Sequence, residues 1–175
     1  MIKQSFLFLP KIRQAKELAI WNQGIYDWDK FLEKKSVKGI SINKKRHYDN
    51  LIKEAKQALF NQNSSYFLGR LPSIELWRLY SYFKDESVFL DIETSGLSSK
   101  SYLTVIGLFD GITTKTMIKS VNLDLNKLEK ELEKYKLILT FNGNSFDLPW
   151  LQHKYPKLLP RIPAIDIMHL CRRIG

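Results

Sequence analysis

The sequence is poor in cysteine, in long apolar runs and in acidic residues, and each shortage excludes something. Cys171 is the one cysteine among 175 residues, so an internal disulfide is excluded. No run of eighteen apolar residues occurs, which excludes a membrane-spanning helix. The short apolar stretch at residues 6–9 lacks the layout of a signal peptide, so we expect a cytoplasmic protein with no membrane association.

Acidic residues are outnumbered, since 28 Lys and Arg face 18 Asp and Glu, a formal net charge of +10. The excess sits in the first half of the chain. Residues 1–84 hold sixteen basic and seven acidic residues, whereas residues 85–175 hold twelve and eleven. Such an excess favours a polyanionic partner and predicts nucleic acid, either DNA or RNA. A basic surface that only keeps the protein soluble is the alternative that charge alone leaves open.

What the chain does have is enough apolar sequence, 44%, for a substantial core. Apolar residues recur at helical spacing in residues 11–21, 26–34 and 73–83. A longer helix, capped by Asn43, is predicted to run to Phe60. We therefore expect residues 1–84 to form an all-helical, basic region.

From residue 85 onward the periodicity changes to that of strands. Apolar, β-rich runs occupy residues 88–92, 102–109 and 113–121, and Asp110-Gly111 between the last two predicts a hairpin. An amphipathic helix at 124–135, a strand at 137–141, a helix at 145–154 and a short strand at 163–167 follow. Residues 85–175 are thus expected to form an α/β domain.

Asp91 and Glu93 end the first apolar strand and are the first candidate site residues. Side chains two apart on a strand point to the same face, so the two carboxylates are expected side by side. Neighbouring carboxylates repel, and a divalent cation such as Mg²⁺ or Mn²⁺ relieves that repulsion. The alternative is a strand that runs into a solvated loop with two ordinary surface acids.

Asp147 is the second candidate, in the first turn of the helix that follows the Asn142-Gly143 turn. Unpaired N–H groups and the helix dipole favour an anion there. Asp147 would then either bind a ligand or only stabilise the helix start.

Together these two segments resemble the first two exonuclease motifs of the DnaQ-like 3′→5′ exonuclease superfamily. The first reads Asp-x-Glu-Thr-x-Gly-Leu at residues 91–97, and the second reads Phe-Asn-Gly-x-x-Phe-Asp-x-Pro-Trp at residues 141–150. The resemblance is strongest to YprB-like ribonuclease H-like proteins. It extends upstream to a degenerate helix-hairpin-helix-like start and downstream to residues 166–173. It implies a ribonuclease H-like mixed sheet with flanking helices over residues 85–175.

The resemblance also implies a nuclease that hydrolyses nucleic-acid phosphodiesters with two divalent ions. Asp91, Glu93 and Asp147 would be three of its four metal-binding, catalytic carboxylates. Thr94 and Asn142 are plausible polar groups on the substrate side, and Lys44, Lys45 and Arg46 are candidate phosphate contacts in the basic region. For these three, a solvated helix start is the alternative.

The family's fourth carboxylate lies on a later helix, but only 28 residues follow Asp147. Asp166, the one acid among them, sits on a predicted strand and reads as a structural residue. We therefore expect a C-terminally truncated domain. This leaves two alternatives to a nuclease: a non-catalytic nucleic-acid-binding module, or an inactive fragment of such an enzyme.

Overall fold

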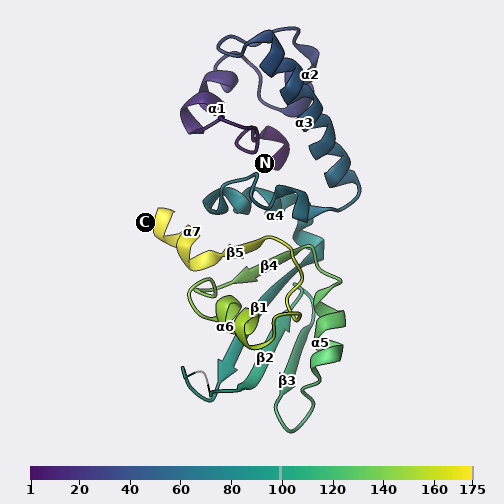
Figure 1. Cartoon of the computed structure of the whole chain (residues 1–175), viewed down its shortest axis with the longest axis vertical. Coiled ribbons are helices and arrows are strands. Elements are labelled where there is room, and N and C mark those ends of the chain that lie inside the picture. The colour runs from purple at the N-terminus through teal and green to yellow at the C-terminus, as the bar shows by residue number, and fades with distance from the viewer. Residues whose placement is uncertain (99, 175) are drawn as a thin grey trace. The chain divides into compact units, whose positions relative to one another are not determined.

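The computed structural model describes residues 1–98 and 100–174, and the chain separates into two compact units (Figure 1). Unit 1 is Met1–Tyr82 and unit 2 is Phe83–Gly175. Each unit is considered by itself. None of the helices in the described part of the chain is long and apolar enough to cross a membrane.

Unit 1 is built from helices, as its periodicity predicts. The α-helices are α1 (Gln14–Trp21), α2 (Trp28–Glu33), α3 (Ile42–Phe60) and α4 (Tyr80–Phe83, which continues one residue into unit 2). The 3₁₀ helices are η1 (Ile2–Gln4), η2 (Ser64–Phe67) and η3 (Ser73–Leu79). Most of the segment 73–83 is therefore 3₁₀ helix rather than the predicted α-helix.

The predicted cap of α3 is wrong by two residues. The hydroxyl of Ser41 accepts the backbone N–H of Lys44 at 3.5 Å, and the helix already begins at Ile42. Asn43 lies inside the first turn, because Ser41 has the extended backbone that a capping residue needs. The end of the helix at Phe60 is as predicted.

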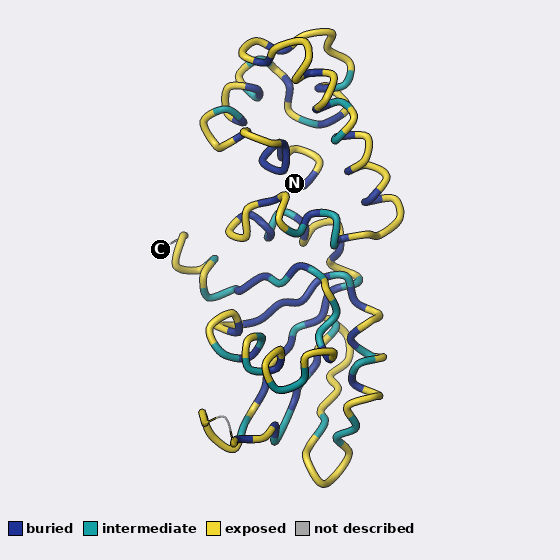
Figure 2. The backbone as a smooth tube through the Cα atoms, viewed as in Figure 1, coloured by how far each residue is buried: buried dark blue, intermediate teal, exposed yellow. Residues whose placement is uncertain are grey.

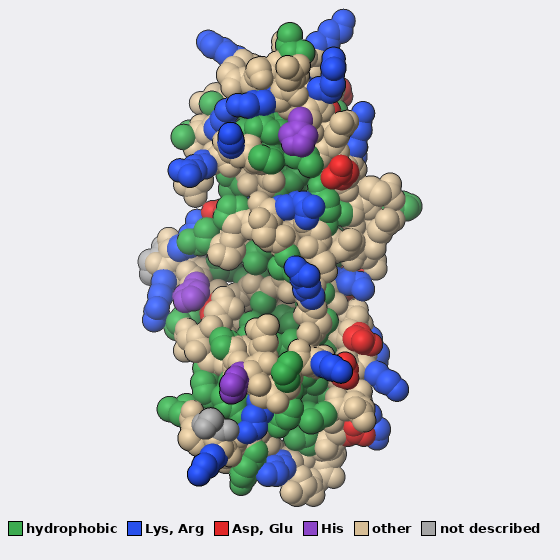
Figure 3. Space-filling view, in the orientation of Figure 1, with side chains coloured by type: hydrophobic (Ala, Val, Ile, Leu, Met, Phe, Trp, Pro, Cys, Tyr) green, Lys and Arg blue, Asp and Glu red, His purple; other side chains and the backbone are tan. Residues whose placement is uncertain are grey.

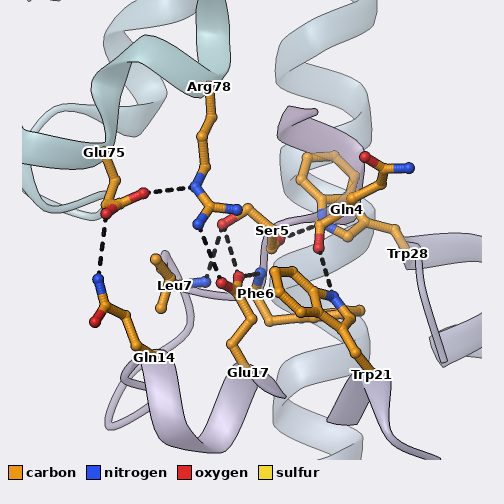
Figure 4. Close-up of polar contacts among 10 residues, drawn as sticks. All are labelled: Gln4, Ser5, Phe6, Leu7, Gln14, Glu17, Trp21, Trp28, Glu75 and Arg78. Atoms are coloured by element: carbon orange, nitrogen blue, oxygen red, sulfur yellow. Dashed lines mark hydrogen bonds and ion pairs between the residues drawn. The ribbon is translucent and has the colours of Figure 1, made fainter. Parts of the chain in front are cut away.

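A buried polar network holds the N-terminal segment of unit 1 (Figure 4). One oxygen of Glu17 accepts the hydroxyl of Ser5 at 3.0 Å and the backbone N–H of Phe6 at 2.7 Å. The guanidinium of Arg78 lies 3.3 Å from the other oxygen of Glu17 and 2.7 Å from Glu75. Because Glu17 and Glu75 are both buried, their charges depend on this arginine.

Unit 2 is a mixed five-stranded sheet with flanking helices, which confirms the predicted fold class. The strands lie in the order β3-β2-β1-β4-β5; β1, β2 and β3 pair antiparallel, and β1, β4 and β5 pair parallel. The strands are β1 (Ser87–Thr94), β2 (Leu103–Phe109), β3 (Thr114–Ile118), β4 (Leu137–Thr140) and β5 (Ala164–Asp166). The helices are η4 (Lys84–Glu86), α5 (Leu125–Leu132), α6 (Asp147–Lys154) and α7 (Ile167–Ile174).

The core of unit 2 lies between one face of the sheet and helices α5 and α6. It includes Leu90 of β1, Leu128 and Leu132 of α5, and Leu151 of α6. Burying each of these side chains contributes about 1.5–3 kcal/mol. Figure 2 shows the buried course of β1 and β4 through the middle of the sheet. The opposite face of the sheet carries Asp91 and Glu93.

Candidate active site

Strand β1 places Asp91 and Glu93 on the face of the sheet opposite the α5–α6 core. Along the strand Val88, Leu90 and Ile92 are buried, whereas Asp91 and Glu93 are exposed. This is the two-residue alternation that the sequence predicts. The two acids share their face because the bulge in the β1–β2 ladder comes only after Glu93.

Asp91 has an open neighbourhood toward β2. Its partner across the antiparallel ladder is Gly107, which has no side chain, whereas Glu93 lies opposite Val105. The residue directly opposite on the next strand therefore has no side chain to cover Asp91. The residue type at position 107 is the signal that sequence reasoning missed, since a glycine inside an apolar strand often marks a close approach or an open site.

Asp147 is tied directly to β1. One of its carboxylate oxygens accepts the backbone N–H of Ile92 at 3.1 Å. Ile92 is the residue between Asp91 and Glu93. Its N–H is accessible to Asp147 because the pairing of β1 with β4 ends at Phe89 and Leu139. The second motif is thus brought against the first. Asp147 lies in the first turn of α6 as predicted, although the helix begins at Asp147 itself and not at residue 145.

The surroundings of Asp147 raise the pKa of its carboxyl. Burial is the largest cause, since the residue is only 7% exposed, and the negative charges of Asp91 and Asp166 add to it. The N–H groups of Ile92 and of Asp147 itself act in the opposite direction and lower the pKa. Asp91 is therefore close enough to repel Asp147.

The turn that leads into α6 is held by Asp166. One of its oxygens accepts the N–H of Asn142 at 2.9 Å and that of Met168 at 3.1 Å; the other accepts the N–H of Asn144 at 3.1 Å. Asp166 is buried, so these bonds compensate for the loss of water around its charge. It acts as the structural residue that its position in the sequence suggests.

Backbone geometry fixes the same turn. Asn142 has a positive φ of 62°, which asparagine tolerates better than most residues. At Gly143, an added Cβ would lie 2.5 Å from the Cβ of Thr140, so a side chain there would collide with β4. The Asn-Gly sequence is therefore required by the close return of the chain over the end of β4.

The structure does not gather the three predicted carboxylates into one cluster. Among residues 1–98 and 100–174, no group of three or more His, Cys, Asp or Glu side chains has the spacing to hold a metal ion. Asp91 and Asp147 interact electrostatically, and Glu93 shares the face of Asp91. Two carboxylates do fit one Mg²⁺ or Mn²⁺, because such an ion commonly takes one or two protein carboxylates and completes its shell with water and phosphate.

An apolar hollow of about 300 Å³ lies on the same face, next to Asp91. Phe89 and Phe109 face each other across β1 and β2 with ring centroids 5.9 Å apart. Leu139 and Phe141, at the end of β4, and Ile167 of α7 complete its wall. These residues were not identified from the sequence, since apolar residues on strands are usually interpreted as core.

The two predicted substrate contacts of unit 2, Thr94 and Asn142, already form hydrogen bonds within the protein. The hydroxyl of Thr94 donates to the carbonyl of Gly96 at 2.9 Å, and the backbone of Asn142 is bonded to Asp166. The Asn142 side chain is exposed near the start of α6. Both residues lie on segments adjoining the carboxylates, at the end of β1 and after β4.

The predicted basic cluster of unit 1 needs a correction at Lys45. Lys44 and Arg46 are exposed at the start of α3, but Lys45 is only 3% exposed. Its ammonium group lies 2.6 Å from Asp49 and 4.8 Å from the ring centroid of Phe31. Lys45 is therefore a packing residue, because helical phase turns it inward while its two neighbours point to solvent.

The described fold and site define an α/β protein with a ribonuclease H-like sheet and acidic side chains on its central strand. A family model for the RNase_H superfamily matches residues 88–175, just over half of the chain. The chain belongs to the RNase H superfamily. No curated protein matches it in a sequence comparison.

Among solved structures, the chain is similar to the crystal structure of the Aedes aegypti Nibbler EXO domain. The two are 13% identical with a TM-score of 0.42, and the match covers 56% of this chain. It covers 51% of the other chain, so this chain spans about half the length of that structure.

Proposed function

We propose that unit 2 hydrolyses phosphodiester bonds of nucleic acid with Asp91 and Asp147 as the metal-binding, catalytic carboxylates. The observation that carries the proposal is the bond from Ile92 to Asp147, which couples the two acidic motifs at the central strand of the sheet. Membership of the RNase H superfamily supports the reaction class. A 3′→5′ exonuclease of the YprB-like kind is the finer form of the same proposal.

The ion that we propose is Mg²⁺ or Mn²⁺. When bound, such an ion supplies a more acidic water molecule and charge stabilisation for the leaving oxygen. Asp91 is exposed to solvent, whereas Asp147 is buried and one of its oxygens already accepts the N–H of Ile92. The raised pKa of Asp147 is the physical sign of a site that favours added positive charge.

Glu93 has a different role in the proposal. It is exposed on the face of Asp91 but forms no cluster of three with the two aspartates in the described residues. We assign it to orienting the attacking water through a hydrogen bond, which requires less exact spacing than ligation. Thr94 and Asn142 would contact the substrate beside it.

The test is hydrolysis of labelled single-stranded DNA and RNA by the purified chain with Mg²⁺, with Mn²⁺ and with EDTA. Cleavage should require the metal and fall at least about 100-fold in Asp91→Asn and Asp147→Asn. Asp85→Asn is the matched control, because Asp85 is an exposed acid of η4 away from these motifs.

Protein that is folded by circular dichroism and cleaves neither substrate would overturn the nuclease proposal. Salt-sensitive binding without turnover would then identify unit 2 as part of a non-catalytic nucleic-acid-binding module. Cleavage that survives in Asp91→Asn would instead show that the activity resides elsewhere or comes from a contaminant.

A further inference from the structure

Unit 1 contains a second surface feature, an open hollow of about 590 Å³ that combines lysines with aromatic rings. Its wall is formed by η1, α2, α3 and the last residue of the unit. The residues that carry the argument are Lys3, Leu32, Lys53, Lys56, Phe60 and Tyr82. All of them belong to unit 1.

Helix α3 supplies a continuous stripe to this hollow. Lys53, Lys56 and Phe60 lie three, then four residues apart, so their side chains share one face of the helix. The adjoining face of α3 is buried through Ile52, Ala55 and other residues. Phe60 is 80% exposed although it is a large apolar residue. An exposed aromatic ring beside two lysines is suited to stacking against a base whose phosphates contact the lysines.

Tyr82 presents the second ring. Its hydroxyl donates to the carbonyl of Leu59 at 3.0 Å, which fixes the orientation of the side chain beside the end of α3. The ammonium group of Lys3 lies 5.7 Å from the centroid of that ring. The aromatic and cationic groups of the hollow are therefore interleaved.

The charge of the surroundings is favourable to an anion. Asp29 lies outside the lining of the hollow but pairs with Lys56, which belongs to it. Both partners of this pair are well exposed, at 65% and 42% of their side-chain surfaces, so the pair is weak and can exchange for a phosphate. Lys and Arg side chains are widespread over the face of unit 1 in Figure 3.

We propose that this hollow binds single-stranded nucleic acid. The lysines contact the phosphates, and unpaired bases stack on Phe60 and Tyr82. Base–aromatic stacking is tolerant of sequence because every base has an aromatic face, and a basic groove follows the backbone. In a duplex the base faces are stacked on one another, so a duplex can offer its phosphates to the lysines but no base faces to Phe60 and Tyr82. The site is separate from the proposed hydrolytic carboxylates and does not depend on their activity.

The test measures the binding of fluorescent oligo-dT and oligo-U, each about 20 nucleotides long, by anisotropy. The buffer contains EDTA so that no hydrolysis occurs. Phe60→Ala should weaken binding about tenfold. Ile42→Ala is the matched control, since Ile42 is 72% exposed on the same helix but outside the hollow. It should leave binding unchanged.

Charge is tested in parallel with Lys53→Ala, compared with Lys35→Ala at an exposed site outside the hollow. Lys53→Ala should reduce the slope of log affinity against log salt by about 0.7, the value for one phosphate contact on a single strand. Lys35→Ala should leave the slope unchanged.

Equal affinities of Phe60→Ala and Ile42→Ala would overturn the proposal, as would equal affinity for a duplex of the same length. Binding in EDTA that depends on Phe60, with no cleavage in Mn²⁺, would support this site and reject only the nuclease function. Cleavage without any effect of Phe60 on binding would do the reverse.

Discussion

The carboxylate of Asp147 accepts a hydrogen bond from the backbone N–H of Ile92 at 3.1 Å, across 55 residues of sequence. Ile92 separates Asp91 from Glu93, so this bond fixes how close the two acidic motifs lie. It also places a buried carboxyl beside another carboxylate. The proximity of the two carboxylates favours binding of a cation, but without the cation their repulsion destabilises the fold.

The first prediction concerns Asp147→Asn. The pKa of Asp147 is raised in the folded state, so its stabilising, protonated form is present at acidic pH and is lost as pH rises through the raised pKa. At neutral pH the native carboxylate costs stability, and Asn keeps an oxygen for the N–H of Ile92. We expect Asp147→Asn to raise Tm by a few degrees at neutral pH and to have little effect below the ordinary pKa of aspartate.

The measurement is thermal unfolding of both proteins across acidic to neutral pH, with and without Mn²⁺. Added Mn²⁺ should raise Tm of the native protein and leave the variant unaffected. A variant that is less stable by the same amount at every pH would contradict the assigned cause.

The second prediction concerns Asp166→Ala. Removing this carboxylate leaves the N–H groups of Asn142, Asn144 and Met168 without their acceptor. We expect a loss of about 2–4 kcal/mol in the free energy of unfolding, measured by urea denaturation. Asp166→Asn should lose less, because its amide oxygen still accepts one or two of the three donors. Hydrogen exchange should rise first at residues 142–144; unchanged protection there would disprove the role of Asp166.

The third prediction concerns Glu17→Ala in unit 1. The substitution leaves Arg78 with one carboxylate instead of two and removes the acceptor of Ser5 and Phe6 (Figure 4). Breaking a buried ion pair from one side costs about 3–5 kcal/mol. Hydrogen exchange of residues 5–7 and urea denaturation followed by tryptophan fluorescence would measure the loss. Glu33→Ala, at an exposed acid of α2, is the control and should cost little.

The fourth prediction concerns Glu131 of α5. Lys115 and Lys134 bond its two oxygens at 2.7 and 2.8 Å and hold the pKa of this carboxyl at about 2. A depressed pKa means that the stabilisation is present above the ordinary pKa of glutamate and is lost as pH falls through about 2. Glu131→Gln should therefore destabilise the protein at neutral pH, by about 1 kcal/mol because both lysines are largely exposed.

The same variant has a second readout at Tyr135. Burial, followed by the hydrogen bond to Glu131, raises the pKa of Tyr135 to about 12. Glu131→Gln should lower that pKa toward the ordinary value of tyrosine, as followed by NMR. Glu133→Gln, at an exposed acid two residues after Glu131, is the control and should change neither Tm nor the Tyr135 titration.

Much of the secondary structure of unit 2 can be predicted from local sequence, because strand alternation and turn formation depend on neighbouring residues. Alternation in β1 places Asp91 and Glu93 on one face, and Asp110-Gly111 gives the hairpin, where Asp110 accepts the N–H groups of Ile112 and Thr113. The order of these elements predicts an α/β domain, and the resemblance of the two acidic motifs implies its ribonuclease H-like form. The spacing of the carboxylates does not, since it depends on a hydrogen bond between residues 92 and 147.

In unit 1, helical phase predicts correctly which side chains of α3 are buried, whereas the run of basic residues alone gives a wrong prediction for Lys45. Lys45 is three residues before Tyr48 and seven before Ile52, both of which are fully buried. That spacing predicts an inward side chain, but a run of three basic residues suggests a surface patch. The hollow around Phe60 was not predicted, because its wall comes from segments far apart in the chain.

Gly107 has a consequence for how the protein can be altered. A Cβ added there would come no closer than 4.0 Å to the carbonyl oxygen of Asp91, an ordinary van der Waals distance. The sheet can therefore accept a larger residue at this position, while the new side chain would stand next to Asp91. Substitution of a single residue that carries no charge thus offers a sterically blocked form of the domain in which every carboxylate is still present.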